Sequence, residues 1–411
     1  MAATDRETAS HIPIEEELWP SERSDVLEWL VTDTSNNRYI DNIFVEMCMR
    51  LHSQNISVAR GSLSFLVQHP QWRGARILWR VGQTEAEFTT YAYGTETSTE
   101  YLNSPVHDIL TGMNEIRHRL DVPPSRDQQY EIYDDLAAEG LTEYAAWPLQ
   151  HTFGKRHVIS FASDRSGGFS SDEIAVLRSL IPAISLVSEI RLKNRMARTL
   201  LETYVGPHAS QEILDGATRR GSGASVGAAI LICDLRDFTR ISDLWPRDDV
   251  IELLNDYFDA MSEPIERYGG EILKFMGDGL LAIFPTSDEG ASSNLMSAIR
   301  EAQVELERLN QRNIQNGHEP LGYGIGVHVG DVMYGNIGSK SRLDFTVIGP
   351  AVNIASRLET LTKSLGKQVL FSEAFVHLAK DQAAFQSEGM QHLRGLEQPI
   401  HVFSMREPSS Q

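Results

Sequence analysis

The sequence has few cysteines, little positive charge and no long apolar run. Only Cys48 and Cys233 occur among its 411 residues, so no disulfide framework is implied and a reducing compartment is expected. No apolar stretch reaches the roughly 18–20 residues that span a bilayer. The first residues also lack the apolar segment of a secretory signal. We therefore expect a soluble, cytoplasmic protein with no membrane span.

Positive charge is scarce relative to negative charge. The chain has 57 Asp and Glu residues against 37 Lys and Arg residues, which gives a formal net charge of −20. A nucleic-acid partner or an anionic membrane surface would need a basic face, so the composition argues against both. A polyphosphate substrate would have to bind at a local site that is cationic or holds a metal ion.

The first half of the chain alternates helical and strand-like patterns after a mixed, acidic extension over residues 1–36. Helical spacing begins at residue 37, and further helical stretches are predicted at 106–120 and 127–136. Strand-like runs occur at 62–68, 75–81, 87–93, 143–149 and 157–162. This α+β order, with Gly168-Phe169-Ser170-Ser171-Asp172-Glu173 opening a last helix, resembles a GAF-type sensor domain over residues 37–190. The resemblance is in element order and not in ligand-binding residues.

The last helix of this half is predicted to be long. Ser170 or Ser171 can cap its start, acidic residues follow, and an apolar seam continues to residue 190. Pro182 predicts a kink. Residues 191–196 are too basic for a core, so we expect the helix to continue as a connector until Gly206-Pro207 breaks it. Residues 191–225 are thus interpreted as a helical linker.

Two aspartates in the second half stand where a carboxylate can face a metal ion. Asp234 follows the apolar run 228–232, which predicts a buried strand, and Asp278 lies in a Gly-flanked turn within a predicted hairpin at 271–284. If strand and hairpin are neighbours in one sheet, the carboxylates converge at its end and can hold two Mg²⁺ ions. Taken singly, each aspartate is explained at least as well as a turn or cap residue.

The remaining pattern predicts a mixed sheet covered by helices. Strands are predicted at 228–235, 323–330, 345–348, 392–396 and 400–405, and helices near 250–268, within 294–313 and at 352–365. Such an alternation suits helices packed over one sheet. Residues 406–411 form a short tail.

Three separated motifs carry a family resemblance. They are Cys233-Asp234-Leu235-Arg236-Asp237-Phe238-Thr239, Lys274-Phe275-Met276-Gly277-Asp278-Gly279 and the run from Asp344 to Arg357. In this order they make residues 226–405 resemble the catalytic domain of class III nucleotidyl cyclases, specifically bacterial adenylate cyclases. The resemblance implies an α+β, ferredoxin-like or palm-type domain that converts ATP into cyclic AMP and pyrophosphate.

The resemblance also implies roles for individual residues. Asp234 and Asp278, with the Leu235 carbonyl, would hold two Mg²⁺ ions per site, with Mn²⁺ as the alternative metal. Phe238 and Thr239 lie where free backbone N–H groups can bind the β- and γ-phosphates. Arg342, or alternatively Lys340, would meet the same phosphates. Asn353 would orient the ribose, and Arg357 would stabilise charge on the α-phosphoryl group.

The base can be argued from hydrogen-bond donors and acceptors. Lys274 offers only donors, so it can bond the adenine N1 acceptor but not the guanine N1–H, and the Thr346 hydroxyl can accept from the adenine amino group. ATP is therefore favoured, and guanylate cyclases of the family carry a carboxylate where Lys274 stands. Without the flanking motif, a solvated strand lysine would be the better interpretation of Lys274.

Two departures from the family pattern leave alternatives open. Asp237 stands where the family usually has Gly, and Leu396 stands where many relatives have a phosphate-binding Lys, for which Arg394 could substitute. These departures support a rival hypothesis, an inactive, nucleotide-binding regulatory domain, which both metal carboxylates, Asn353 and Arg357 argue against. A guanylate cyclase is a second rival, which Lys274 opposes.

In the family, one subunit supplies the metal carboxylates and the other supplies the lysine, threonine, asparagine and arginine. This chain has both sets, so the resemblance implies a homodimer with two complete sites. The N-terminal half would regulate how two chains face each other, in response to a small molecule or a protein partner that the sequence does not identify.

Overall fold

The computed structural model describes residues 24–406 except 68, 70 and 123–129, and it divides into two compact units, residues 1–199 and 200–411. Most of the predicted N-terminal extension, the start of the predicted helix 127–136 and nearly all of the predicted tail lie outside the described residues. Within the described part of the chain, no helix combines the length and apolar character that crossing a membrane requires.

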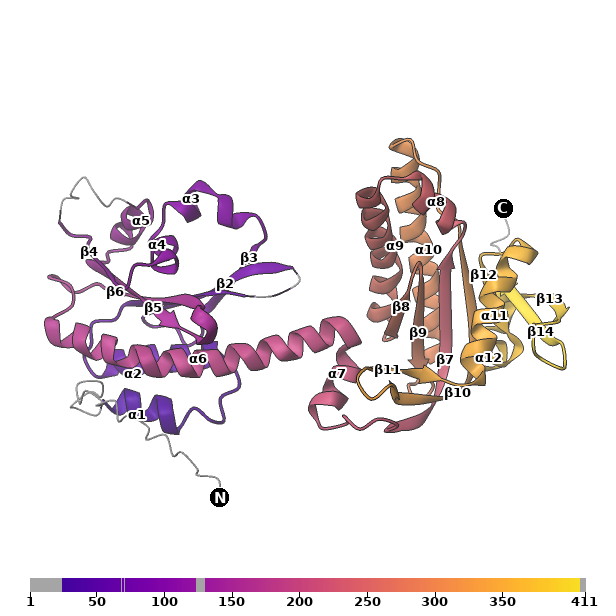
Figure 1. Cartoon of the computed structure of the whole chain (residues 1–411), viewed down its shortest axis with the longest axis horizontal. Helices are drawn as coiled ribbons and strands as arrows, with labels where there is room; N and C mark the ends of the chain where they lie inside the picture. Colours follow the sequence, from indigo (N-terminus) through magenta and orange to yellow (C-terminus); the bar gives the residue numbers. More distant parts are fainter. Residues whose placement is uncertain (1–23, 68, 70, 123–129, 407–411) are drawn as a thin grey trace, which may run out of the picture. The chain divides into compact units, whose positions relative to one another are not determined.

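The N-terminal unit is an antiparallel sheet between two helical layers (Figure 1). Its strands lie in the order β3 (Glu87–Ala92), β2 (Trp72–Arg80), β1 (Arg60–Leu66), β6 (Arg156–Ser163), β5 (Glu143–Gln150) and β4 (Ile116–Arg119). One face is covered by α1 (Asp25–Thr32), α2 (Ile40–Ser53) and α6 (Ser171–Val205), and the other by α3 (Thr99–Leu102), α4 (Pro105–Thr111) and α5 (Ile132–Ala138). Successive side chains of β5 point to opposite faces of the sheet, so the strand contributes to both layers. Trp147 packs in the core with α1, α2 and α6, and Tyr144 packs in the core with α4 and α5.

The predicted helix over 106–120 is wrong in its second half. Helix α4 ends at Thr111, and Gly112 follows with φ 151°, a conformation that glycine adopts without steric cost. The chain then forms β4, which pairs antiparallel with β5. The strand is only four residues long, too short for a period-2 pattern to stand out beside the preceding helix.

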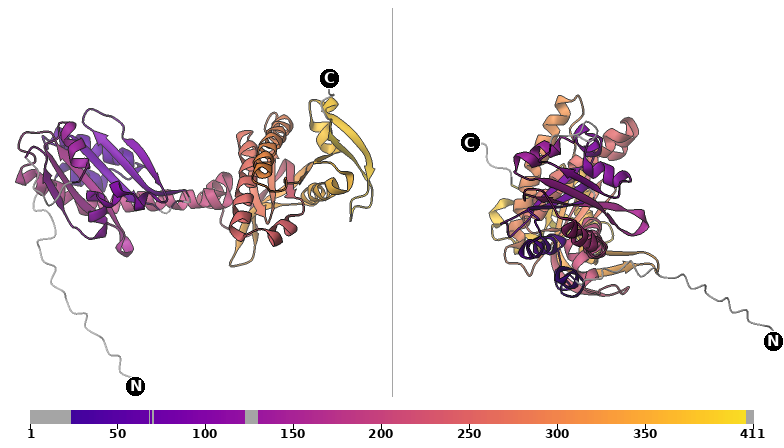
Figure 2. Two further views of the ribbon diagram at one scale, coloured as in Figure 1. Left: turned by 90° about the horizontal axis from the view of Figure 1, so that it is seen from above. Right: turned by 90° about the vertical axis from the view of Figure 1, so that its left-hand side faces the viewer.

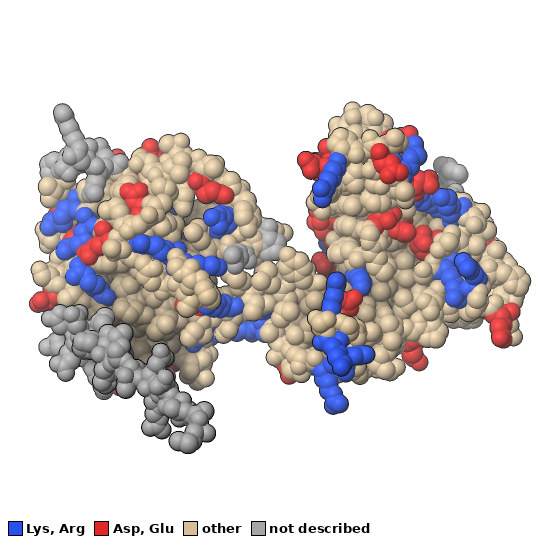
Figure 3. Space-filling view, viewed as in Figure 1, with Lys and Arg blue, Asp and Glu red and all other residues tan. Residues whose placement is uncertain are grey.

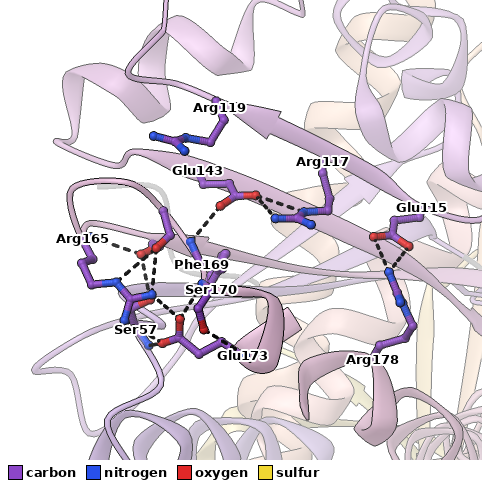
Figure 4. Close-up of polar contacts among 12 residues, drawn as sticks. Ser57, Glu115, Arg117, Arg119, Glu143, Arg165, Phe169, Ser170, Glu173 and Arg178 are labelled. Carbon is purple, nitrogen blue, oxygen red and sulfur yellow. Dashed lines mark hydrogen bonds and ion pairs between the residues drawn. The ribbon is translucent and has the colours of Figure 1, made fainter. Parts of the chain in front are cut away.

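The start of α6 is fixed to the sheet by buried carboxylates (Figure 4). The Glu173 N–H donates to the Ser170 hydroxyl at 3.2 Å, and the Ser170 N–H donates to the Glu173 carboxylate at 2.7 Å, which is a capping box. The Phe169 N–H donates to Glu143, which is 2% exposed, at 2.7 Å. These bonds hold the first turn of the helix in place.

From that anchored start, α6 continues as one helix across Pro182 to Val205, as predicted for the connector (Figure 2). Its buried residues end at Glu189. Beyond Glu189 the helix is therefore less covered by its own domain than in its first half.

The second unit is built on one mixed sheet. The order is β13 (Phe385–Gln391), β14 (Ile400–Met405), β12 (Val369–Ser372), β10 (Tyr323–Gly338), β7 (Gly223–Leu235), β9 (Gly279–Pro285) and β8 (Glu271–Met276), with β11 (Leu343–Ile348) paired to β10. The pairing of β10 with β12 is parallel and the other pairings are antiparallel. Helix α7 (Pro207–Leu214) precedes the sheet, and α8 (Phe238–Leu244) follows β7.

Successive side chains along β7 point to opposite faces of this sheet and pack with different helices. Leu231 and Cys233 pack with α9 (Arg247–Arg267), α10 (Ala291–Gln315) and α12 (Glu373–Leu378), whereas Ile230 and Ile232 pack with α11 (Pro350–Leu365). The parity of the strand places Asp234 on the α11 face. This places a carboxylate at the end of a buried strand, on the face that α11 covers.

The predicted strand at 392–396 is wrong. Those residues form a turn in which Gly395 has φ 79° and the Leu396 N–H donates to the Leu393 carbonyl at 3.0 Å. The strand that pairs with β14 is β13, which ends at Gln391. The sequence of β13 has little apolar alternation because most of its side chains are at least partly exposed.

Candidate active site

Asp234 and Asp278 meet at the end of the β7–β9 ladder. Asp234 is opposite Gly279 on β9, and Asp278 is the residue before Gly279, in the turn that follows β8. A Cβ atom at position 279 would stand 2.9 Å from the Asp234 Oδ1 atom. It would also stand 2.9 Å from the Cys233 carbonyl oxygen, so a side chain at 279 would crowd both the β7 backbone and the Asp234 carboxylate.

The negative charge of Asp278 acts on Asp234. The pKa of Asp234 is raised to about 6, first by burial and then by the negative charge of Asp278. Such a pair favours a cation between or beside its members. In the part of the chain that the structure describes, no group of three or more His, Cys, Asp or Glu side chains forms a metal cluster. Two carboxylates still fit Mg²⁺, which is commonly held by one or two carboxylates together with substrate phosphates.

A cavity of about 980 Å³ opens beside this pair. It is lined by Asp234, Leu235, Asp237, Phe238, Thr239, Arg240, Asp243, Leu244, Asp278 and Lys363. Five of the residues predicted from sequence therefore surround one space. The Arg240 N–H donates to the Asp237 carbonyl at 3.0 Å, so the amides of Phe238 and Thr239 precede the first hydrogen bond of α8.

Asp237, the unexpected carboxylate in this cavity, has a charge partner. Its backbone is left-handed, with φ 56° and ψ 27°, which glycine would adopt at lower cost. The Lys363 Nζ atom donates to the Asp237 Oδ1 atom at 3.0 Å and lowers the pKa of Asp237. This lysine reduces the repulsion of an anionic ligand that the sequence alone predicts for Asp237.

The predicted base-binding residues lie on other strands, outside this cavity. The Lys274 Nζ atom on β8 donates to the Asp344 carboxylate on β11 at 2.7 Å. Thr346 is on the same short strand and pairs with Gly335 on β10. Lys and Arg side chains are visible in groups on the face of the second unit drawn in Figure 3. Arg342 directly precedes β11, and Lys340 lies two residues before Arg342 in the chain.

Two faces of helix α11 carry residues that bear on the candidate site. Asn353 and Arg357 are four residues apart and share a face, whereas Glu359 and Lys363 share another, because successive residues turn by about 100°. Lys363 lines the cavity beside the Asp pair, and neither Asn353 nor Arg357 does. A Cβ atom at Gly395 would stand 3.2 Å from the Arg357 guanidinium. The residues predicted to orient the ribose and to stabilise the α-phosphoryl charge are therefore not part of the cavity beside the carboxylates of their own chain.

Glu359 was missed by the sequence reasoning. A Cβ atom at Gly324, the β10 partner of Asp234, would stand 2.8 Å from the Glu359 Oε1 atom. The pKa of Glu359 is raised to about 7, first by burial and then by Asp234. The spacing of Glu359 and Lys363 along the helix was the available signal, but nothing local shows which strand that face covers.

The second unit is similar to known proteins. Residues 224–406 match the family model of the adenylate and guanylate cyclase catalytic domain. An adenylate cyclase of Anabaena cylindrica is 35% identical over 218 residues, which are 50% of this chain and 42% of that protein. Adenylate cyclase 1 of Rhizobium meliloti (strain 1021) is 30% identical over 177 residues, covering 43% of this chain and 27% of that protein. The chain thus spans less than half the length of either relative.

Solved structures are similar over the same part of the chain. The guanylyl cyclase Cya2 is 32% identical with a TM-score of 0.40, covering 46% of this chain and 97% of that one. The adenylyl cyclase CyaB from P. aeruginosa is 26% identical with a TM-score of 0.40, covering 46% of this chain and 98% of that one.

Proposed function

We propose that this chain is an adenylate cyclase, from the premise that its C-terminal domain, residues 224–406, belongs to the family of adenylate and guanylate cyclase catalytic domains. The reaction is attack of the ATP ribose 3′-oxygen on the α-phosphorus, with pyrophosphate as the leaving group. The observation that carries the proposal is the convergence of Asp234 and Asp278 beside a large cavity, because charge neutralisation and positioning dominate phosphoryl transfer.

Two Mg²⁺ ions, or Mn²⁺, would supply activation of the 3′-oxygen and charge neutralisation on the leaving phosphates. Asp234, Asp278 and the Leu235 carbonyl would hold them. Phe238 and Thr239 would bind the β- and γ-phosphates through their amides, and Arg342 would approach the same phosphates. In this proposal the cations would bind at one place, the end of β7, where the two carboxylates meet.

A second copy of the chain would complete each site. Asn353 and Arg357 do not line the cavity beside their own carboxylates. Exposed apolar side chains lie on the strands that carry the base-binding residues: Phe275 and Met276 on β8 are 49% and 43% exposed, and Ile348 on β11 is 51% exposed. An uncovered apolar surface of this kind is typical of an interface. We infer a homodimer in which one protomer binds the phosphates and its partner binds the base and ribose.

Adenine is the proposed base. Lys274 would donate to adenine N1, and Thr346 would accept from the 6-amino group. The ion pair with Asp344 supports this, because a carboxylate acceptor fixes the lysine while its ammonium keeps further donors. Relatives at similar identity include proteins described as adenylate and as guanylyl cyclases, so the argument for ATP depends on these side chains.

The N-terminal unit is proposed to regulate the enzyme as a GAF-like domain over residues 37–190, joined by a linker over 191–225. Its six-stranded antiparallel sheet between two helical layers and the continuous helix α6 support this assignment. A cytoplasmic location is proposed because both cysteines are free and buried.

One assay tests the proposed function. The purified chain is incubated with Mg²⁺ or Mn²⁺ and either ATP or GTP, and the products are separated by chromatography. We expect cyclic AMP from ATP and much less cyclic GMP from GTP. Cyclic GMP as the main product would support a guanylate cyclase, and no product from either nucleotide would support an inactive regulatory domain.

Metal binding should stabilise the protein in a pH-dependent way. Without metal, the raised pKa of Asp234 means that its contribution to stability is full below about pH 4 and is lost as the pH rises through about 6. Mg²⁺ binds the ionised carboxylates, so we expect it to raise the Tm more near about pH 7.5 than near about pH 5. Thermal unfolding with and without Mg²⁺ measures this effect, and Asp278→Asn should remove it, whereas the exposed Asp259→Asn should not.

Removing Lys363 should weaken ATP use through Asp237. In Lys363→Ala, the Asp237 carboxylate loses its partner at 3.0 Å and repels the triphosphate, so we expect kcat/KM to fall by roughly three- to tenfold. Asp237→Gly should be tolerated because the backbone is already left-handed. Steady-state kinetics of the single and double variants test this, since Asp237→Gly should restore most of the activity that Lys363→Ala loses. Additive losses would show that the two residues act independently.

A further inference from the structure

The N-terminal unit contains a cavity of about 640 Å³ that the proposed reaction does not use. It lies between the β1–β2–β3 side of the sheet, the start of α2 and residues 189–199 of α6. Its volume is within the range of about 300–1,000 Å³ typical of small-molecule sites. All the lining residues belong to the same compact unit.

The inner wall of this cavity is apolar and aromatic. Phe65 on β1 and Ile77 on β2 are 3% and 1% exposed, and both line the space. Trp72 and Phe88 line it further toward the solvent. Flat side chains on neighbouring strands offer planar contact surfaces, which suits an aromatic or otherwise planar ligand.

The wall is also cationic, in a chain with a formal net charge of −20. Five Lys and Arg residues line the cavity against two carboxylates, Asp41 and Glu189. Glu189 is already engaged, because Lys193 pairs with it at 2.6 Å and the Thr152 N–H donates to it at 3.1 Å. The Glu189 carboxylate therefore does not neutralise the rest of the wall.

Two arginines in this wall have no carboxylate partner among the described residues. The guanidinium carbons of Arg38 and Arg195 lie 5.5 Å and 5.7 Å from the centroid of the Tyr39 ring. Arg38 lies two residues before the start of α2 and Arg195 lies on α6, so two segments distant in the sequence each place a guanidinium near the same aromatic ring. Lys155 lines the same cavity and likewise has no ion pair within the described part of the chain.

A buried, neutral imidazole is also part of this wall. His157 is 3% exposed, and its Nδ1 atom accepts the Leu66 N–H at 3.1 Å. Burial lowers the pKa of His157 to about 3, so the ring is neutral and its proton is on Nε2. No described residue accepts that proton, and His157 is part of the cavity wall.

We propose that this cavity is a binding site for a planar, aromatic small molecule that carries a negative charge. The ring system packs against Phe65, Ile77 and Trp72, and the anionic group meets Arg38 and Arg195. Because residues 189–199 form one wall, the ligand adds contacts to the part of α6 beyond its last buried residue, Glu189. Occupancy would therefore change how firmly the connector helix is held against its own domain.

The test uses two fluorescent probes with the same ring system. 8-Anilinonaphthalene-1-sulfonate carries a sulfonate, and N-phenyl-1-naphthylamine is its neutral counterpart. Both are titrated into the full chain without nucleotide, so the result does not depend on cyclase activity. We expect the sulfonate probe to bind at one site per chain. In Arg38→Ala/Arg195→Ala its affinity should fall roughly tenfold or more, while the neutral probe changes little.

Two further variants separate this site from non-specific binding. Thr90→Trp, at a lining position on β3, should fill the cavity and remove binding of both probes. Arg73→Ala on β2 removes a cation that does not line the cavity and should leave both affinities unchanged. The proposal is overturned if the sulfonate probe does not bind, if it binds equally well to the double arginine variant, or if Thr90→Trp leaves its binding intact.

Discussion

Asp278→Ala is expected to abolish cyclic AMP formation, lowering kcat by at least about a thousandfold, or about 4 kcal/mol. The reason is local. Asp278 meets Asp234 at the end of β7, and its charge contributes to the raised pKa of Asp234. Without it, the metal ions lose one of the carboxylates proposed to hold them, and the triphosphate loses the cations that would neutralise its charge. Product formation from ATP at saturating Mg²⁺ measures the loss.

The matched control is Asp259→Ala. Asp259 is an exposed aspartate on α9 that does not line the cavity. Its removal changes the net charge by the same amount, and we expect kcat within about twofold of the parent. If Asp278→Ala kept substantial activity with an unchanged Tm, the carboxylate pair would not be the metal site.

The second large effect is recovery of activity from two inactive chains. Arg357→Ala should be as inactive as Asp278→Ala, because the guanidinium acts on charge that develops in the transition state. Mixing the two variants should restore roughly a quarter of the parent activity, since about half of the dimers are mixed and each mixed dimer keeps one intact site of two. Activity is measured as a function of mixing ratio, with refolding or co-expression to exchange the subunits.

The control for this experiment mixes two variants with lesions in the same half-site. Asp234→Ala with Asp278→Ala should recover nothing, because every site in a mixed dimer then lacks one carboxylate. Recovery in this control, or none in the Asp278 and Arg357 mixture despite demonstrated subunit exchange, would contradict a site shared between chains.

The elements that could be predicted from the sequence are those marked by neighbouring residues along the chain, such as an apolar run, a turn or a helix cap. The hairpin β8–β9 and the strand β7, which carries Asp234 near its end, have strong apolar patterns, and the structure confirms their pairing. Helix α6 begins at Ser171 because the capping residues precede it immediately. These local patterns place each carboxylate at the end of its own strand or turn, and the predicted convergence depended on strand and hairpin being neighbours, which the pairing of β7 with β9 confirms.

Other features depended on contacts between distant segments. The strand β4 is recognisable only through its pairing with β5, and β13 through its pairing with β14. The partner of Asp237 is Lys363, 126 residues away, so the sequence alone predicted repulsion where the structure places an ion pair. Glu359 likewise reaches Asp234 only because α11 crosses β10 at Gly324.

The most direct test of the shared site is a crystal structure of the protein with a non-cyclising ATP analogue and Mg²⁺. The account predicts that the phosphates contact Asp234 and Asp278 of one protomer while the adenine contacts Lys274 and Thr346 of its partner. A nucleotide held entirely by one protomer, or an adenine remote from Lys274, would contradict it.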